Sequence, residues 1–209
     1  MKIPGLNLEA GTIFGIGRNY AEHAKELGNP IPASPLVFLK PRSALCGDES
    51  TIQLPEISQN VHYETEIVVA IGQATQGISE ADALSIVAGF AVGIDVTARD
   101  LQEDAKKKGQ PWAIAKGLPS FAPVSRFVPA TLPLRLELRV NGQLRQEGSS
   151  EEMLFPIPKL ISFLSQTFHL LPGDLIFTGT PKGVERLHPG DELHASLIGH
   201  SELRLRVTR

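Results

Sequence analysis

Alternation of apolar and polar residues is the most frequent pattern along the chain. It is strict over residues 134–140, 193–197 and 203–207, and this period of two is typical of strands with one buried face. Residues 134–140 lead into Asn141-Gly142, the preferred two-residue hairpin turn because both positions need a positive φ. The two C-terminal runs lie on either side of Gly199-His200. The pattern therefore predicts a hairpin after residue 134 and a second strand pair near the C-terminus.

Other segments are short and almost wholly apolar. They cover residues 12–16 before Gly17, 36–39 before Pro41, 66–71, and 91–94. Continuous apolar runs of this length are expected for strands that are covered on both faces. We therefore predict four further strands, of which residues 66–71 and 91–94 belong to the core.

A period near 3.6 is confined to three segments. Residues 156–168 carry apolar side chains on one helical stripe. A second helix is predicted to begin at Ser79 as the N-cap, with Asp82 as the acidic partner of a capping box and with Leu84 and Val87 facing inward. A third, weaker helix is predicted from residue 19 to about residue 27.

Strands outnumber helices in this prediction, and the two do not alternate regularly along the chain. The 19 glycines and 16 prolines are spread along the 209 residues, which favours many short strands and turns. These features indicate an α+β fold that is mainly β, with mixed sheets and a few flanking helices. Because there is no repeat and no low-complexity linker, residues 1–209 are predicted to form one domain.

Composition narrows the classes of function. Apolar residues make up 42% of the chain, charged residues make up 21%, and the net charge is −3. There is no basic stripe of the kind that binds nucleic acid, and Lys106, Lys107 and Lys108 are interpreted as a solvated helix face. No apolar run reaches the length of a membrane span or a signal peptide. With a single cysteine, Cys46, the chain has no disulfide framework, and we expect a cytoplasmic protein.

The most informative stretch is His62-Tyr63-Glu64-Thr65-Glu66, directly before an apolar strand. Side chains on a strand alternate between faces, so His62, Glu64 and Glu66 should project from one side. A further carboxylate, Asp95, ends the apolar run 91–94. Three acidic residues at the ends of core strands suit a hard divalent cation such as Mg²⁺ or Mn²⁺. His62 is interpreted as a neighbour of these carboxylates, with direct metal ligation as the alternative.

Further candidate residues surround this acidic group in the sequence. Arg99 and Gln102 lie within two helical turns of Asp95, and Lys116 stands in an apolar segment, where a lysine near a metal could stabilise an oxyanion. His23 and Glu26 are three residues apart and would share a helix face. An imidazole that is oriented by a carboxylate can take a proton from water. Finally, residues 178–184 form a glycine-bearing loop that could hold a carboxylate.

Six blocks of the sequence resemble those of the fumarylacetoacetate hydrolase family, in particular its short single-domain members, which include acylpyruvate hydrolases and oxaloacetate decarboxylases. The blocks follow one another in order and cover the chain from about residue 11 to its end. They are Gly17-Arg18-Asn19-Tyr20-Ala21-Glu22-His23, Phe38-Leu39-Lys40-Pro41, His62-Tyr63-Glu64-Thr65-Glu66, Asp95-Val96-Thr97-Ala98-Arg99-Asp100, Gly109-Gln110-Pro111-Trp112 and Thr178-Gly179-Thr180-Pro181.

The resemblance implies a mixed β-roll or barrel-like fold with flanking helices, assembled as a homodimer, and a lid at about residues 18–30. It also implies a role for each candidate residue. Glu64, Glu66 and Asp95 would be the Mg²⁺ ligands, with Mn²⁺ as the alternative ion. His23 and Glu26 would activate water, and Lys116 would lie beside the metal. The remaining candidates, Arg99, Gln102 and Thr180, would contact a small 2-oxo acid substrate.

The reaction predicted from these roles is hydrolysis of the carbon–carbon bond of an acylpyruvate, such as acetylpyruvate or fumarylpyruvate. Pyruvate would depart as an enolate stabilised by Mg²⁺ and Lys116. Oxaloacetate decarboxylation and oxaloacetate tautomerisation are alternatives, because both can use the same chelate. A non-catalytic module that binds carboxylates or cations is an alternative of another class.

Overall fold

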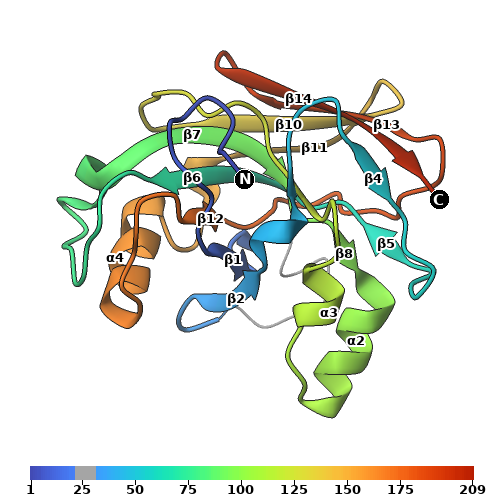
Figure 1. Cartoon of the computed structure of the whole chain (residues 1–209), viewed down its shortest axis with the longest axis horizontal. Helices are drawn as coiled ribbons and strands as arrows, with labels where there is room; N and C mark the ends of the chain where they lie inside the picture. Colours follow the sequence, from blue (N-terminus) through green and yellow to red (C-terminus); the bar gives the residue numbers. More distant parts are fainter. Residues whose placement is uncertain (22–31) are drawn as a thin grey trace.

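Two five-stranded sheets pack against each other in the part of the chain that the structure describes (Figure 1). The structure is a computed structural model that describes residues 1–21 and 32–209. The first sheet is mixed, because β1 pairs with β12 in parallel while its other pairs are antiparallel. In the order of the sheet, its strands are β2 (Leu36–Lys40), β1 (Ile13–Gly17), β12 (Leu175–Phe177), β6 (Thr65–Ile71) and β7 (Val87–Ile94).

Strands β6 and β7 of the first sheet are buried on both faces, as their continuous apolar runs predicted. Every residue of β6 is buried, and so are the last six residues of β7. The two strands pair antiparallel with Thr65 opposite Ile94. The N-terminal end of β6 and the C-terminal end of β7 therefore lie together.

The second sheet carries the alternating segments. In sheet order its strands are β11 (Gln143–Ser149), β10 (Arg135–Val140), β13 (Glu192–Leu197), β14 (Ser201–Thr208) and β4 (Thr51–Gln53). The predicted hairpin joins β10 to β11, with φ of 52° at Asn141 and 78° at Gly142. Its strands keep register until a bulge at Leu138/Arg139, which adds Arg145 to β11 and leaves the next residue, Gln146, buried.

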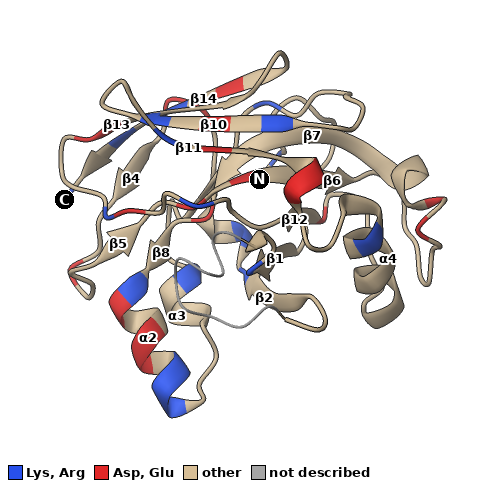
Figure 2. Ribbon diagram, turned by 180° about the vertical axis from the view of Figure 1, so that it is seen from behind, with Lys and Arg blue, Asp and Glu red and all other residues tan. Residues whose placement is uncertain are grey.

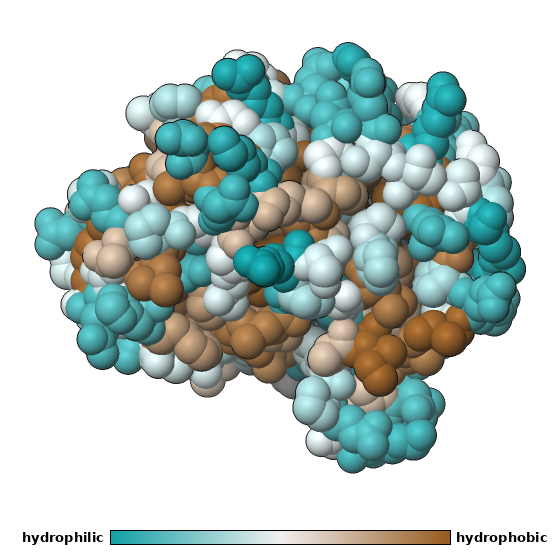
Figure 3. Space-filling view, in the orientation of Figure 1, coloured by the Kyte–Doolittle hydropathy of each residue, from teal (hydrophilic) through white to brown (hydrophobic). Residues whose placement is uncertain are grey.

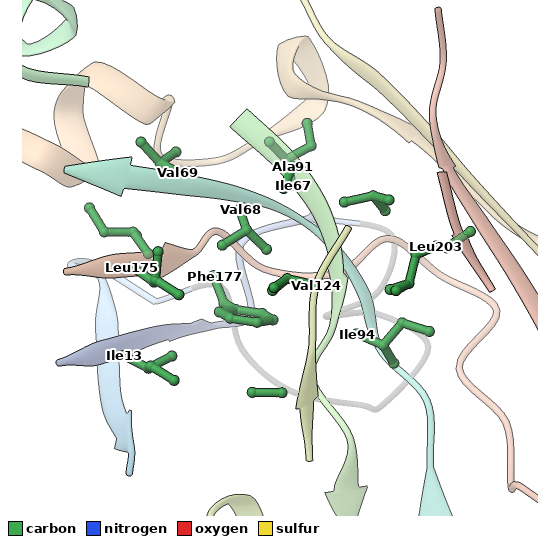
Figure 4. Close-up of a cluster of buried hydrophobic side chains, with 14 of the residues drawn as sticks. Ile13, Ile67, Val68, Val69, Ala91, Ile94, Val124, Leu175, Phe177 and Leu203 are labelled. Carbon is green, nitrogen blue, oxygen red and sulfur yellow. The ribbon is translucent and has the colours of Figure 1, made fainter. Parts of the chain in front are cut away.

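The faces that the two sheets turn toward each other form the core. Strands β6 and β7 contact β10, β13 and β14. Figure 4 shows Val68 from β6, Ile94 from β7, Phe177 from β12 and Leu203 from β14 in one cluster of buried side chains, and all four are fully buried. Each side chain of this size contributes about 1.5–3 kcal/mol when it leaves water.

Three α-helices flank the sheets in the described residues: α2 (Arg99–Lys108), α3 (Ala113–Lys116) and α4 (Ile157–Thr167). Helix α4 confirms the stripe predicted over residues 156–168. The helix predicted from Ser79 is wrong: only a 3-10 helix, Ala83–Ile86, forms there, and Leu84 is exposed. Val87 already begins β7, because the long apolar run from this residue gains more by entering the sheet.

Short elements complete the described fold. Two small sheets pair β3 (Leu45–Cys46) with β9 (Ala122–Pro123), and β5 (Val61–His62) with β8 (Thr97–Ala98). Hydrophilic and apolar areas are interspersed on the face in Figure 3, and the hydrophilic lobe at its lower edge is the C-terminal end of α2. None of the described helices is long and apolar enough to cross a membrane. The helix predicted for residues 19–27 lies mostly outside the described residues.

Candidate metal centre and active site

Three carboxylates meet where β6 begins and β7 ends. Glu64 and Glu66 are two residues apart and share a face, while Asp95 directly follows β7. The backbone N–H of Asp95 donates to the carbonyl of Glu64 at 2.8 Å, which joins the two strand ends. One ligand oxygen from each of the three side chains can be chosen so that all lie within 4.8 Å of one another. The strand pairing thus gathers three buried carboxylates in one place.

Buried cations compensate the charge of this cluster. The Lys116 ammonium donates to Glu64 Oε2 at 2.8 Å and to Asp95 Oδ2 at 2.5 Å. On the other side of Asp95, Lys40 Nζ lies 2.6 Å from Oδ1. The guanidinium of Arg99 pairs with Glu64 Oε1. Among the described residues, two of the three carboxylates are therefore ion-paired before any ligand enters.

Glu66 differs from the other two, because it forms no ion pair with a described residue. Its Oε2 accepts a hydrogen bond from the backbone N–H of Gly179 at 2.7 Å. Burial raises the pKa of Glu66 well above its ordinary value, and the negative charges of Asp95 and Glu64 raise it further. A divalent cation in contact with the cluster would favour the charged form, so Glu66 is where added positive charge is most needed.

The protonation of Lys116 follows from its two partners. Burial acts to lower the pKa of Lys116, but the charges of Asp95 and Glu64 outweigh it and raise the pKa. Its Nζ also donates to Thr97 Oγ1 at 2.7 Å. All three donor positions of the ammonium are thus directed to oxygen atoms, and the side chain remains a cation at the edge of the carboxylate cluster.

Lys40 is a component of this centre to which the sequence analysis gave no role. Its ammonium is fully buried and donates to the carbonyls of Lys116 at 2.6 Å, Phe121 at 2.8 Å and Val96 at 3.1 Å. Burial lowers the pKa of Lys40, against the effect of Asp95. The only feature of the sequence that could have indicated this role is the position of Lys40 at the end of an apolar strand. Its partners lie 55 to 81 positions away along the chain, and no local pattern identifies them.

The loop after β12 brings Thr180 to the site. Gly179 has a φ of +100°, and a Cβ there would lie 2.6 Å from Cβ of Asn19, so this turn requires glycine. The buried amide of Gln146 donates to Thr180 Oγ1 at 2.9 Å and accepts from the N–H of Thr65 at 2.9 Å. Gln146 therefore connects the loop to the start of β6, a role that no pattern in the sequence around it predicted.

Arg99 and Gln102 lie on the first turn of α2 and are both buried. The Arg99 guanidinium donates to Gln102 Oε1 at 2.6 Å, while it also pairs with Glu64. The structure thus places both candidate substrate contacts beside the carboxylate cluster.

Asn19 attaches the segment after β1 to the loop that holds Thr180. Its Nδ2 donates to the carbonyl of Thr178 at 2.8 Å and to that of Phe155 at 3.1 Å, and its Oδ1 accepts from the N–H of Phe155 at 2.8 Å. The side chain is fully buried, so no water can replace these bonds without a rearrangement.

We expect Asn19→Ala to lower the free energy of unfolding by about 3 kcal/mol, because buried N–H and C=O groups would lose their partners. Urea denaturation measures the change. Asn60→Ala is the control, since it removes one hydrogen bond between half-buried side chains and should cost under about 1 kcal/mol. Equal losses of unfolding free energy in the two variants would contradict the role of Asn19 in attaching its segment to the Thr180 loop.

His62 is not a member of the carboxylate cluster among the described residues. Its Nε2 lies 2.9 Å from Asn60 Oδ1, and burial, followed by the charge of Arg99, lowers the pKa of His62 to about 4. His62 belongs to the separate strand β5, and the charge of Glu64 acts on its pKa, so it is a neighbour of the cluster, as interpreted, and not one of its members. His23 and Glu26 lie outside the described residues.

A pocket opens over the cluster. Its lining includes six of the predicted site residues, two aromatic side chains and two further basic residues, Arg18 and Lys106. The lining residues are Ile16, Gly17, Arg18, Phe38, Glu64, Glu66, Arg99, Gln102, Lys106, Trp112, Lys116 and Thr180. Lys106, Lys107 and Lys108 are exposed, as predicted, and Lys106 also borders the pocket.

The donor set fits a divalent cation. Carboxylate oxygens are the preferred ligands of Mg²⁺ and Mn²⁺, and three of them converge from the ends of rigid core strands. Two of the three carboxylates, Glu64 and Glu66, line the pocket. A mainly β scaffold with a buried acidic metal site under a polar pocket defines a metal-dependent enzyme rather than a structural module.

Comparison with known proteins agrees with this class. The family model described as fumarylacetoacetate (FAA) hydrolase C-terminal matches residues 12–208, and the chain belongs to this family. This confirms the resemblance and the mainly β fold. The mitochondrial oxaloacetate tautomerase FAHD1 of Mus musculus is 46% identical over 202 residues, which cover 94% of this chain and 91% of the relative. The Arabidopsis thaliana protein of the same name is 42% identical over the same shares.

Solved structures give the same picture. The crystal structure of fumarylpyruvate hydrolase from Pseudomonas aeruginosa, in complex with Mn²⁺ and pyruvate, superposes with a TM-score of 0.93 at 35% identity, covering 99% of this chain and 94% of that one. A putative fumarylacetoacetate isomerase/hydrolase from Oleispira antarctica reaches 0.92 at 42% identity, with 97% and 95% covered. The chain is therefore an enzyme of this family with a divalent-metal site at Glu64, Glu66 and Asp95.

Proposed function

We propose that this enzyme is a divalent-metal-dependent oxaloacetate tautomerase, which interconverts the keto and enol forms of oxaloacetate. The observation that carries the choice of reaction is the 46% identity to the mouse oxaloacetate tautomerase over almost the whole length of both chains. The identity to the fumarylpyruvate hydrolase is lower, at 35%. The sequence analysis predicted acylpyruvate hydrolysis first and gave oxaloacetate tautomerisation as an alternative. The proposal now places tautomerisation first.

The site supports enolisation of a 2-oxo acid. Tautomerisation moves one proton from C3 to the 2-oxo oxygen, so that negative charge develops on that oxygen when the C3 proton leaves first. A divalent cation at Glu64, Glu66 and Asp95 supplies Lewis acidity to the 2-oxo group when bound. We assign the ion as Mg²⁺, with Mn²⁺ as the alternative.

We assign Lys116 the role of stabilising the developing oxyanion. Its ammonium already contacts Glu64 and Asp95 at 2.8 and 2.5 Å, so it stands where a substrate oxygen would approach the metal ligands. A fixed, desolvated cation at this position stabilises negative charge that appears during the reaction, with little reorganisation. The partners of Lys116 keep it positively charged, as the reaction requires.

Arg99, Gln102 and Thr180 are proposed to bind the substrate. All three line the pocket, and each is held by a side-chain hydrogen bond, Arg99 to Gln102 and Thr180 to Gln146. Donors fixed in this way orient a carboxylate without losing much side-chain entropy on binding. We propose, from the sequence, that His23 moves the C3 proton and that Glu26 orients the imidazole.

Acylpyruvate hydrolysis is the second candidate, favoured by the TM-score of 0.93 to the fumarylpyruvate hydrolase with Mn²⁺ and pyruvate. There His23 would take a proton from water, and the hydroxide would add to the distal carbonyl carbon. The carbon–carbon bond then breaks to give a carboxylic acid and pyruvate. Decarboxylation of oxaloacetate is the third outcome, in which the C4 carboxylate leaves as CO₂ and pyruvate remains.

A substrate panel tests these assignments. We expect purified enzyme with Mg²⁺ to accelerate loss of the ultraviolet absorbance of enol-oxaloacetate more strongly than it releases pyruvate from oxaloacetate, acetylpyruvate or fumarylpyruvate. The same assays run with Mn²⁺ and in excess EDTA, and EDTA should remove the activity. Faster hydrolysis of an acylpyruvate would replace the proposal by the second candidate, and undiminished activity in EDTA would refute the role of the metal.

The variant His23→Ala separates the reactions further. It should slow hydrolysis and tautomerisation, by about 10²–10⁴-fold for lost acid–base assistance, but should affect decarboxylation less, because that reaction needs no base. We also propose a homodimer, which light scattering would test. The cytoplasmic location stays a prediction.

A further inference from the structure

We propose that Arg18 and Lys106 form a subsite for a second carboxylate, which makes the pocket selective for 2-oxo acids that carry an acidic group at the far end. The inference deepens the proposed function, on which it rests. Both residues line the same pocket as Glu64, Glu66 and Lys116. Neither forms an ion pair with a described residue.

Two aromatic rings, Phe38 and Trp112, connect Lys106 of this subsite with Lys116 of the carboxylate cluster. Lys116 Nζ lies 4.7 Å from the centroid of the Phe38 ring, the rings of Phe38 and Trp112 are 5.8 Å apart, and Lys106 Nζ lies 5.2 Å from the Trp112 ring. Each of the two lysines thus lies against a different ring of this pair. A ligand that contacts both rings is therefore close to a cation at each of them.

The two basic groups of the subsite are close enough to interact. Burial lowers the pKa of Lys106, and the charges of Arg99 and Arg18 lower it further. Gathering cations in this way costs free energy unless an anion enters between them. The helix α2 carries basic residues at both ends, Arg99 at the cluster and Lys106 at the pocket rim, which Figure 2 shows as its blue segments.

Arg18 is held in position by its neighbours in the chain. Its φ is +59°, a conformation that costs a non-glycine residue free energy and persists where the surroundings enforce it. The next residue, Asn19, provides that constraint through its three buried hydrogen bonds. The guanidinium is thereby carried on a fixed backbone at the edge of the pocket rather than on a free loop.

The charges also agree with a doubly charged ligand. Lys40, Lys116 and Arg99 balance the charges of the three cluster carboxylates. A divalent cation at the cluster together with Arg18 and Lys106 then adds four positive charges. A dicarboxylate such as oxaloacetate compensates two of them, one at the metal and one at the subsite, whereas a 2-oxo acid with a single carboxylate leaves the charges of Arg18 and Lys106 uncompensated.

Two probes that differ in one group test the subsite. 2-Oxoglutarate and 2-oxopentanoate have the same chain length, but only the first has a second carboxylate. In calorimetry with Mn²⁺-loaded enzyme, we expect 2-oxoglutarate to bind more tightly. Arg18→Gln should weaken its binding at least about tenfold, the loss expected for a charge-assisted hydrogen bond, and should leave 2-oxopentanoate within about twofold.

Lys106→Gln should act in the same direction, and the control Lys107→Gln, at the exposed neighbouring position on α2, should change neither ligand. In catalysis, Arg18→Gln should raise KM for oxaloacetate more than it lowers kcat. An equal loss for both probes, or no loss for either, would overturn the subsite. Because binding is measured with probes that are not the substrate, the subsite can stand even when tautomerase activity is not found.

Discussion

The variant Asp95→Asn is expected to lose saturable binding of Mg²⁺ and Mn²⁺ and to lose turnover by about 10³-fold or more. Asparagine has nearly the same shape but no charge, so the cluster would lose one anionic ligand. Lys116 and Lys40, which contact the two carboxylate oxygens of Asp95, would then leave excess positive charge at the metal site. Both changes oppose a cation, and a metal supplies several kcal/mol of stabilisation to a developing oxyanion.

Calorimetric titration with Mn²⁺ and a turnover assay together measure this loss. Asp104→Asn is the matched control, because Asp104 is an exposed residue of α2 whose partner is Lys108, and it should bind Mn²⁺ as the unaltered protein does. Circular dichroism establishes that the Asp95 variant is folded. A folded variant whose affinity for Mn²⁺ stays within a few-fold of the original would show that the ion binds elsewhere.

The strands were predictable because a strand that is buried on both faces has apolar residues at almost every position. Residues 66–71 and 91–94 are apolar throughout, and β6 and β7 are buried on both faces. The error at Ser79 has an equally local cause. The hydroxyl of Ser79 does bond to Asp82, as a cap would, but this pair closes a turn, and the apolar run from Val87 joins the sheet instead.

The acidic half of the site was predictable, whereas the groups that compensate and connect it were predictable only in part. Glu64, Glu66 and Asp95 stand at the ends of apolar strands, so their convergence follows from strand pairing. Lys40 and Gln146 are recognised only by their partners, which lie up to 81 positions away. Nothing in a local window distinguishes such a buried lysine from one that is exposed.

This difference has an electrostatic reason. Carboxylates that gather at strand ends need positive charge nearby to compensate their own. Their presence therefore implies that lysine or arginine side chains lie beside them, but it does not identify which ones. The chain offers 20 lysines and arginines, and the fold brings three of them into ion pairs with the cluster. Only Lys116, with its apolar neighbours, and Arg99, near Asp95, were identified beforehand.

Lys40 provides the second large prediction. We expect Lys40→Met to lower the free energy of unfolding in EDTA by about 3–5 kcal/mol, the usual cost when one partner of a buried ion pair is removed. The variant would leave Asp95 without one of its two counter-ions. It would also leave the carbonyls of Val96, Lys116 and Phe121 without the ammonium that now joins them.

The metal should recover part of this loss. Saturating Mn²⁺ is expected to raise the melting temperature of Lys40→Met by more than it raises that of the unaltered protein, because the ion replaces a missing positive charge beside Asp95 and binds only the folded state. Thermal denaturation in EDTA and in Mn²⁺ measures both shifts, with Lys107→Met as the exposed control that should change neither. A fold that needed Lys40 only for its carbonyl contacts would be destabilised in EDTA, yet its melting temperature would rise with Mn²⁺ by the same amount as the original. Equal shifts in melting temperature would show that the charge of Lys40 does not affect the binding of the metal ion.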